Sequence, residues 1–287
     1  MNRLKVRRLL EDFFIEDIGD QDVTSDFLFP EDAEGELHFV SKQSGIFCGS
    51  EIIREGYQLL DPSIMIELYT QDGTEVGSGE CIAAIQGPIV NLLKGERVIL
   101  NLIQRMSGIA TNTKRAVETL NNQETKICDT RKTTPGLRMF EKYAVRMGGG
   151  VNHRYGLYDA VMLKDNHIAF AGSILKAVEI VRAKLGHMVK IEVETETEAQ
   201  VKEAVQARAD CIMFDNRSPE EISTLVKFVP SHITTEASGG IHLNNLAAYR
   251  ESGVDYISLG ALTHSATSLD ISANVSIKQR RPNYESI

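Results

Sequence analysis

The stretch of sequence that decides the fold is VKIEVETETEAQVKEAVQARADCIMFDNRSPEEISTLVKFV, residues 189–229. It begins with a short apolar, β-branched run at 189–194, and a helical pattern follows. The same order repeats with CIMFD at 211–215 and a second helix, which Ser218 can cap and which has Pro219 at its first helical position. Short strands that alternate with amphipathic helices predict parallel strands joined by right-handed crossovers.

The same unit of strand and helix extends on both sides of this stretch. Polar residues stand where these strands end, and ligands bind at the carboxyl ends of parallel strands in an α/β barrel and in an open doubly wound sheet. No GxGxxG motif follows the first strand, so six regular units favour a closed or nearly closed barrel. The other expected strands are 126–130, 160–164, 232–238 and 256–260, and the other expected helices are 173–185 and 243–252.

The first 110 residues mix short elements of both kinds. Residues 71–88 look like half of a biotinyl or lipoyl hammerhead, which carries a modifiable lysine at a hairpin tip. No lysine lies between Lys42 and Lys94, so a plain β-meander packed on helices is favoured over a carrier domain. We expect helices at 3–14, 50–60 and 89–106, and strands at 35–41, 64–70 and 81–86.

The composition is that of a globular protein with an acidic balance. The 287 residues carry a formal net charge of -9, which argues against nonspecific binding to nucleic acid. No apolar run approaches the length of about 18 residues that a membrane span needs, and the first 17 residues resemble an amphipathic helix more than a signal peptide. The four cysteines form no CxxC pair, and we expect reduced thiols and a cytoplasmic location.

One basic segment stands out against this acidic background. Residues 131–164 contain seven Lys or Arg and only two acids, Glu141 and Asp159, for a net charge of +5. Arginine grips carboxylates and phosphates bidentately and lysine adds a mobile charge, so the segment predicts a pocket for a small, multiply charged anion. The alternative is a solvated basic face. The basic residues are Arg131, Lys132, Arg138, Lys142, Arg146, Arg154 and Lys164.

Two glycine turns and two acids mark further strand ends. Ser238-Gly239-Gly240 and Leu259-Gly260-Ala261 follow the last two strands, where barrels bind phosphate through backbone N–H groups, although such glycines can also serve only as tight turns. Glu194 and Asp215 end adjacent strands. Such a pair can hold Mg²⁺, bind sugar hydroxyls or act as acid and base, and each acid could equally cap a helix or pair with a lysine.

Lys164 and His153 leave alternatives open. A buried barrel lysine such as Lys164 can form a Schiff base with a carbonyl substrate, which makes an aldolase-like lyase a competitor. Charge pairing with an anion is favoured because Arg and His crowd the same segment. His153 could be a core histidine, but Gly148-Gly149-Gly150 beside it favours a loop that faces the substrate.

Together, these residues and motifs resemble those of the quinolinate phosphoribosyltransferase family. The matching motifs run in order over nearly the whole chain, and we find no broken position among those that the family uses. They are EDIGDQDVTSD (16–26), ERVILNLIQRMSGIAT (96–111), DTRKTTPGLR (129–138), GGGVNHRYGLYD (148–159), MLKDNH (162–167), IEVE (191–194), FDN (214–216), EASGGI (236–241) and SLGALTHS (258–265).

The resemblance implies an α/β fold in which an N-terminal α/β sandwich domain (1–110) precedes an incomplete α/β barrel (111–275) and a C-terminal tail (276–287). It implies a reaction in which quinolinate and phosphoribosyl pyrophosphate give nicotinate mononucleotide, pyrophosphate and CO₂ with Mg²⁺, in NAD biosynthesis. It also implies a homodimer or higher homo-oligomer, in which one subunit's N-terminal domain covers the barrel mouth of the other. No nucleic acid or membrane partner is expected.

The resemblance also assigns roles to individual residues. Catalytic roles are implied for Lys132, Lys164, Glu194 and Asp215, the last two also as metal ligands, directly or through water. Arg105 would reach quinolinate from the partner subunit. Two rivals remain: a related phosphoribosyltransferase found with molybdate transport, which takes a different ring acid, and the lyase that uses Lys164. The implied substrate-binding residues are Arg105, Thr130, Arg131, Lys132, His153, Arg154, Lys164, Glu194, Asp215, Ser238, Gly239, Gly240, Leu259, Gly260 and Ala261.

Overall fold

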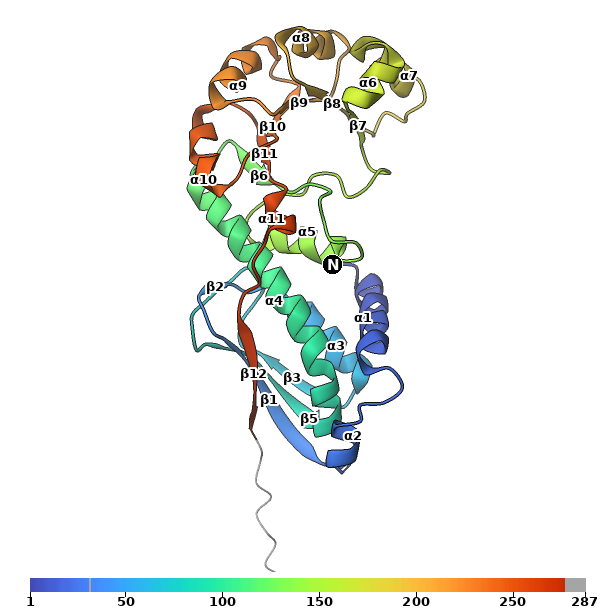
Figure 1. Ribbon diagram of the computed structural model, residues 1–287, viewed down its shortest axis with the longest axis vertical. Coiled ribbons are helices and arrows are strands. Elements are labelled where there is room, and N and C mark those ends of the chain that lie inside the picture. Colours follow the sequence, from blue (N-terminus) through green and yellow to red (C-terminus); the bar gives the residue numbers. More distant parts are fainter. Residues whose placement is uncertain (31, 277–287) are drawn as a thin grey trace, which may run out of the picture. The chain divides into compact units, whose positions relative to one another are not determined.

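The computed structural model describes residues 1–30 and 32–276 and divides into two compact units (Figure 1). The second unit comprises Asn112–Ala266, and the first comprises Met1–Thr111 together with the described residues from Thr267 onward. The division after Thr111 falls within one residue of the predicted boundary. The mixed α/β class, with an N-terminal sheet domain and a C-terminal parallel sheet flanked by helices, is confirmed.

The predicted domain limits need one correction, which concerns residues 267–275. We assigned them to the barrel, but they belong to the first unit, where β12 (Ile271–Ser276) pairs antiparallel with β1 (Glu34–Ser41). No helix follows this strand within the described residues, so it cannot form another barrel unit. Its pairing covers an edge of β1 that would otherwise be exposed. The predicted tail lies outside the described residues except for Ser276.

The sheet of the first unit has four strands in the order β12-β1-β5-β3. Buried and more exposed residues alternate along β1, so one face of the sheet is covered. Phe39 of β1 lies 6.3 Å, between ring centroids, from Tyr57 of α3, whose hydroxyl donates to the carbonyl of Leu92 in α4. The remaining elements of this unit are α1 (Arg3–Ile18), α2 (Ser25–Leu28), β2 (Gly45–Ile46), α3 (Ser50–Leu60), β3 (Met65–Leu68), β4 (Glu75–Val76), β5 (Cys81–Pro88) and the first part of α4 (Ile89–Leu120).

The second unit contains a parallel sheet of six strands in the order β6-β11-β10-β9-β8-β7. The first strand of this unit, β6, therefore lies beside its last strand, β11, as it would in a closed barrel. The seam between β6 and β7 stays open, so the barrel is incomplete, as expected. The strands are β6 (Lys126–Cys128), β7 (Val161–Leu163), β8 (Ile191–Thr195), β9 (Cys211–Asp215), β10 (Thr234–Ser238) and β11 (Tyr256–Ser258).

The chain between these strands is helical and close to prediction. In α9 the sequence signals hold, since Ser218 caps the helix by accepting from the Glu221 N–H and Pro219 occupies the first turn. No described helix is both long and apolar enough to cross a bilayer. The helices of this unit beyond α4 are α5 (Arg138–Met147), α6 (Asp165–Ala171), α7 (Ile174–Arg182), α8 (Glu198–Gln206), α9 (Pro219–Leu225), η1 (Val226–Phe228), α10 (Leu243–Leu246), η2 (Ala247–Glu251) and α11 (Ala261–His264).

Candidate active site

Two buried, oppositely charged side chains, Lys142 and Asp129, hold the loop after α5 that carries His153 and Arg154. The Nζ atom of Lys142 lies 2.5 Å from Oδ1 of Asp129, and both side chains are fully buried. Asp129 also accepts from Asn152 Nδ2 at 2.6 Å and from the His153 backbone N–H at 2.9 Å, while Lys142 Nζ donates to the His153 carbonyl at 3.0 Å. Burial raises the pKa of Asp129, and Lys142 opposes this rise. Lys142 therefore holds the loop through Asp129, and its buried amine is not available to a ligand.

The loop places two arginines next to each other. Val151 forms an isolated parallel bridge with Cys128. Arg154 follows Val151 by three residues, and Arg131 follows Cys128 by three residues. Burial and then the charge of Arg131 lower the pKa of Arg154. The Nε–H groups of both arginines are buried and have no hydrogen-bond partner among the described residues. We call these two residues the arginine pair. Buried, unpaired donors on like charges favour a bound anion.

The other basic residues of the segment go to separate places. Arg138 donates from Nε to Thr133 Oγ1 at 2.9 Å and from Nη1 to the Tyr155 carbonyl at 3.0 Å, and Arg146 is exposed on α5. Lys132 lies at the end of β11 because β6 and β11 are neighbours, and its stem is close to Gly260. The basic segment is therefore neither one pocket nor one solvated face. Lys142 and Arg138 hold the local structure, whereas the arginine pair can bind a ligand.

A lysine and two acids meet where β7, β8 and β9 end. Lys164, which follows β7, forms an ion pair with Glu194 of β8. Burial raises the pKa of Glu194, the contacts with Lys164 lower it, and the charge of Asp215 raises it further. Asp215, at the end of β9, also accepts from Asn216 Nδ2 at 2.8 Å. The two acids are therefore near each other, as expected from their adjacent strands, and Lys164 compensates part of their charge.

The glycines after β10 occupy a turn that only glycine fits well. Gly239 has a φ of +85°, and a Cβ there would lie 2.3 Å from Oδ1 of Asn216. Gly240 has a φ of +65°, and Asn216 itself has a φ of 54° while its N–H donates to the Ser238 carbonyl at 2.9 Å. After β11, Gly260 leads into the short helix α11, which begins at Ala261, and the Leu259 N–H donates to the Cys128 carbonyl.

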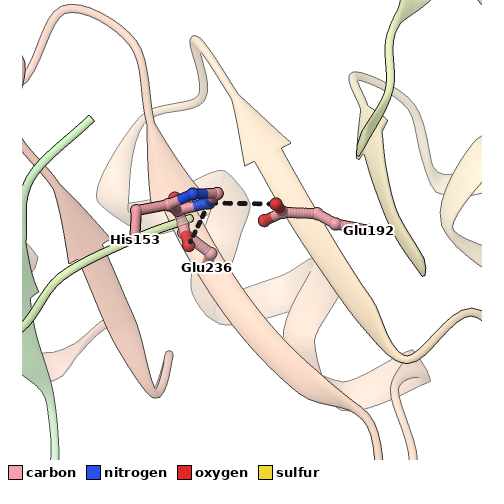
Figure 2. A group of neighbouring side chains, drawn as sticks. All are labelled: His153, Glu192 and Glu236. Atoms are coloured by element: carbon pink, nitrogen blue, oxygen red, sulfur yellow. Dashed lines mark ion pairs between the residues drawn. The ribbon is translucent and has the colours of Figure 1, made fainter. Parts of the chain in front are cut away.

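A third cluster brings His153 together with Glu192 of β8 and Glu236 of β10, and we call these three residues the buried triad (Figure 2). Nε2 of His153 is 3.0 Å from Glu192 Oε2 and 3.5 Å from Glu236 Oε2. Burial and then the charge of Glu192 raise the pKa of Glu236 to about 8. Burial lowers the pKa of His153, but the two glutamates outweigh it and the pKa rises. Among the described residues this is the one group of three or more such side chains that could hold a metal ion.

Two family models match the chain, and the boundary between them falls close to the division of the structure after Thr111, although the second model also covers residues 267–274 of the first unit. The N-terminal domain of quinolinate phosphoribosyl transferase matches residues 22–107, and its C-terminal domain matches residues 109–274.

The chain belongs to the quinolinate phosphoribosyltransferase family.

Several members of this family match this chain over nearly its whole length. A probable nicotinate-nucleotide pyrophosphorylase (carboxylating) of Bacillus subtilis (strain 168) is 56% identical over 96% of this chain and 96% of its own. A mitochondrial quinolinate phosphoribosyltransferase (decarboxylating), 2a, of Nicotiana tabacum is 40% identical over 91% of this chain and 79% of its own. The crystal structure of NadC from Streptococcus pyogenes superposes with a TM-score of 0.93 at 38% identity, covering 96% of this chain and 98% of that chain.

The family resemblance assigned Arg105 to a partner's site. In this structure Arg105 is half-buried on α4 and takes part in an interaction, so it is not a free surface arginine. Arg97 lies on the same helix with 61% of its side chain exposed, and its Nη2 lies 3.7 Å from Glu96 Oε1. Exposure makes Arg97 a second candidate for any role that reaches outside the chain.

Sequence reasoning missed most of the buried triad and the anchor of the loop. The sequence motifs do not predict that Glu192 of β8 and Glu236, which lies within β10, meet His153. The available signal was a charged residue in the middle of a short, buried strand, because such a charge needs a partner. The partners come from distant parts of the chain: Glu192 and Glu236 meet His153, and Asp129 meets Lys142.

Proposed function

We propose that this chain transfers the phosphoribosyl group of phosphoribosyl pyrophosphate to the ring nitrogen of quinolinate, with release of pyrophosphate and CO₂ to give nicotinate mononucleotide. The observation that carries the proposal is the arginine pair, whose buried Nε–H groups have no hydrogen-bond partner in the described part of the chain. A ring with two adjacent carboxylates supplies acceptors and two negative charges to such a pair. A monoacid such as nicotinate supplies one carboxylate and would leave part of the pair uncompensated. The relatives named for this activity support the same substrate.

The chemistry needs alignment more than a nucleophilic side chain. The ring nitrogen forms a bond to C1 of the ribose while the bond from C1 to the pyrophosphate oxygen breaks, so positive charge develops at C1. Glu194 and Asp215 supply negative charge for that carbon. The product ring nitrogen is cationic, and its charge stabilises the electron pair that remains on the adjacent ring carbon when the carboxylate departs as CO₂. A proton then replaces the carboxylate on the ring carbon.

The 5′-phosphate of the sugar fits the glycine turn after β10. The backbone of Gly239 and Gly240 can come close to a phosphate because neither residue has a side chain. Ser238, Leu259 and the Gly260-Ala261 turn would complete this end, where Lys132 also lies. The ring acid would then lie at the arginine pair and the ribose between them, over Glu194 and Asp215.

Mg²⁺ is proposed for the same place. Two nearby carboxylates, Glu194 and Asp215, are oxygen donors of the kind that this ion prefers, and they could bind it directly or through water. The rise in the pKa of Glu194 that burial and Asp215 cause fits a cation there, because a cation would relieve the repulsion. When bound with the pyrophosphate group, the ion would neutralise negative charge on the leaving group.

Replacing either acid by its amide tests its assignment to the sugar. Glu194→Gln and Asp215→Asn keep the size and remove the charge, so turnover should fall on the order of 10²–10³-fold, as for a lost transition-state contact. Quinolinate affinity, measured by calorimetry without the second substrate, should stay the same or tighten. If Asp215→Asn weakens quinolinate binding while turnover holds, the acid belongs to the ring-acid site and the ribose lies elsewhere.

A Schiff-base lyase is the competing function, and the setting of Lys164 does not favour it. The amine is paired with Glu194 and its side chain is 45% exposed, whereas a nucleophilic lysine is typically desolvated or next to another cation. Borohydride in the presence of a carbonyl substrate would trap an adduct on Lys164 if the lyase were right.

The decisive assay offers quinolinate and nicotinate side by side, with and without Mg²⁺. We expect nicotinate mononucleotide and CO₂ from quinolinate, dependence on Mg²⁺, and at least about 30-fold slower use of nicotinate, since an uncompensated buried charge costs roughly 2–5 kcal/mol. Equal turnover of the two acids would contradict the proposal. Turnover of a different ring acid alone would identify the molybdate-associated relative instead.

Assembly and location are proposals as well. A homodimer or higher homo-oligomer with shared sites is supported by exposed apolar side chains before and after β7, at Leu157, Tyr158 and Phe170, of which Phe170 is 94% exposed. A partner subunit that covers this part of the barrel would bury them. A cytoplasmic location is supported by four cysteines that are all free thiols. The absence of nucleic-acid and membrane partners stays a prediction.

A further inference from the structure

Both ring nitrogens of His153 are engaged inside the protein. Nδ1 accepts a hydrogen bond from the Arg154 backbone N–H at 2.8 Å, so this nitrogen has no proton in that arrangement. The proton of the neutral ring then sits on Nε2, which faces Glu192 at 3.0 Å and Glu236 at 3.5 Å (Figure 2). A histidine with both nitrogens occupied in this way has no donor or acceptor left for a substrate.

The position of the buried triad agrees with this. Glu192 precedes Glu194 by two residues on β8, and Glu236 precedes Ser238 by two residues on β10. Side chains two apart on a strand share a face, so the two glutamates lie one layer deeper in the barrel than the acid and the glycine turn that would meet substrate. The side chain of His153 is 13% exposed and those of the glutamates 8% and 5%.

We propose that His153 is a positioning residue, which fixes Arg154 for the ring acid and makes no bond to substrate itself. The inference rests on the proposed function, because the anion that Arg154 would bind is quinolinate. The glutamates hold the imidazole, the imidazole holds the Arg154 backbone N–H, and the guanidinium is tied at its far end by a bond from Nη1 to the Ala160 carbonyl at 2.9 Å. Arg154 is thus fixed at both ends, with its Nε–H left for the ligand.

A double-mutant cycle on quinolinate affinity separates positioning from direct contact. Calorimetry is run on the wild type, His153→Ala, Arg154→Ala and the double variant. We expect His153→Ala to weaken binding on the order of 10- to 100-fold, as for a misplaced binding group, and to have less than about a 3-fold further effect once Arg154 is alanine. In an Arg131→Ala background, which serves as the matched control, the effect of His153→Ala should persist in full.

Amide replacements of the imidazole give a second test, whose expected difference in quinolinate affinity a general loss of stability would not produce. His153→Asn places an oxygen acceptor near the Nδ1 position, beside the Arg154 N–H, whereas His153→Gln places its amide donor toward Glu192 and leaves that N–H without an acceptor. We expect His153→Asn to keep quinolinate affinity within about 5-fold of the wild type, and His153→Gln to resemble His153→Ala. The comparison also serves if His153→Ala does not fold.

Three results would overturn the proposal. The same loss from His153→Ala in the Arg154→Ala background as in the wild type would make His153 a direct ligand. So would poorer binding by His153→Asn than by His153→Gln. Stoichiometric zinc in the dialysed wild type would also overturn it, because a metal at Nε2 replaces the proton that Glu192 accepts. Failure of the proposed function is distinct, since the wild type itself would then not bind quinolinate.

Discussion

At the residue scale, the guanidinium of Arg154 combines three properties that rarely coincide on a surface arginine. Its Nε–H is buried and has no hydrogen-bond partner among the residues that the structure describes, burial and Arg131 lower its pKa, and its Nη1 donates to the Ala160 carbonyl. Burying a charge next to a like charge is unfavourable unless a counter-ion completes the arrangement. The arginine pair is therefore costly in the empty protein and favourable when a dianion is bound.

The first prediction concerns Arg154→Lys. Lysine keeps the charge but cannot reproduce the planar fork, so quinolinate affinity should fall about 10-fold or more, measured by calorimetry. Arg146→Lys is the matched control, because Arg146 belongs to the same basic segment and is exposed on α5. It should bind within about 2-fold of the wild type. Equal effects at the two positions would mean that the segment acts only through its summed charge.

The second prediction concerns Glu236 and pH. The folded protein raises the pKa of this carboxyl from 4.5 to about 8 through burial and Glu192, so it keeps a proton that the unfolded chain releases between these values. Its contribution to the free energy of unfolding is therefore full below pH 4.5 and is lost as the pH rises through about 8. Glu236→Gln cannot lose this proton. Its stability relative to the wild type should increase as the pH rises across that window.

Urea denaturation at a series of pH values measures this difference. Glu179→Gln makes the same chemical change on the exposed face of α7 and serves as the control, for which we expect no comparable trend. A difference between Glu236→Gln and the wild type that stays flat from pH 4.5 to 8 would show that Glu236 is ionised in the folded protein at neutral pH.

At the element scale, the turn after β10 is defined by backbone angles that side chains avoid. Gly239→Ala puts a Cβ 2.3 Å from Asn216 Oδ1 at a φ of +85°, and Gly79→Ala meets nothing within 4 Å at the same φ. Both should lose about 1–2 kcal/mol of stability from the backbone angle alone. Gly239→Ala should lose more and should raise the KM for phosphoribosyl pyrophosphate several-fold, which Gly79→Ala should not.

Thermal denaturation and steady-state kinetics on the two alanine variants test this. An unchanged KM in Gly239→Ala would place the 5′-phosphate away from this turn. The pair is informative because the backbone strain is matched and only the surroundings differ. Loss of stability without loss of affinity would make the glycine a purely structural requirement of the turn.

At the scale of the whole molecule, the proposed sharing of sites between subunits can be tested by mixing variants. Lys132→Ala is mixed with Arg105→Ala and, separately, with Arg97→Ala, each being nearly inactive alone if its residue serves a site. Random exchange in a dimer makes half of the molecules heterodimers with one intact site of two, so about a quarter of wild-type activity should return. Exposure favours Arg97, and the family resemblance named Arg105.

Recovery with one arginine variant alone would identify the residue that crosses between subunits. No recovery with either, once subunit exchange is verified by mixed-label mass spectrometry, would mean that each site is built within one chain. The two arginines make a matched pair because both lie on α4.

The sequence by itself determined the alternation of strands and helices in the second unit and which residues stand at the ends of its strands. Hydrophobic period, capping residues such as Ser218 and the run of apolar residues in a buried strand are local properties, and each can be read without knowledge of the partner. Lys164, Glu194 and Asp215 were expected near one another because adjacent parallel strands end at one edge, and they meet there.

Only the tertiary structure decided which distant residues meet. The strand order places β6 beside β11 and so brings Lys132 to Gly260. The folded chain also pairs Asp129 with Lys142 and places Glu192 and Glu236 beside His153. It also returned β12 to the first unit, against our expectation. Charges buried in this way reveal only that a partner is needed. The identity of the partner depends on chain closure over tens of residues, which no local period encodes.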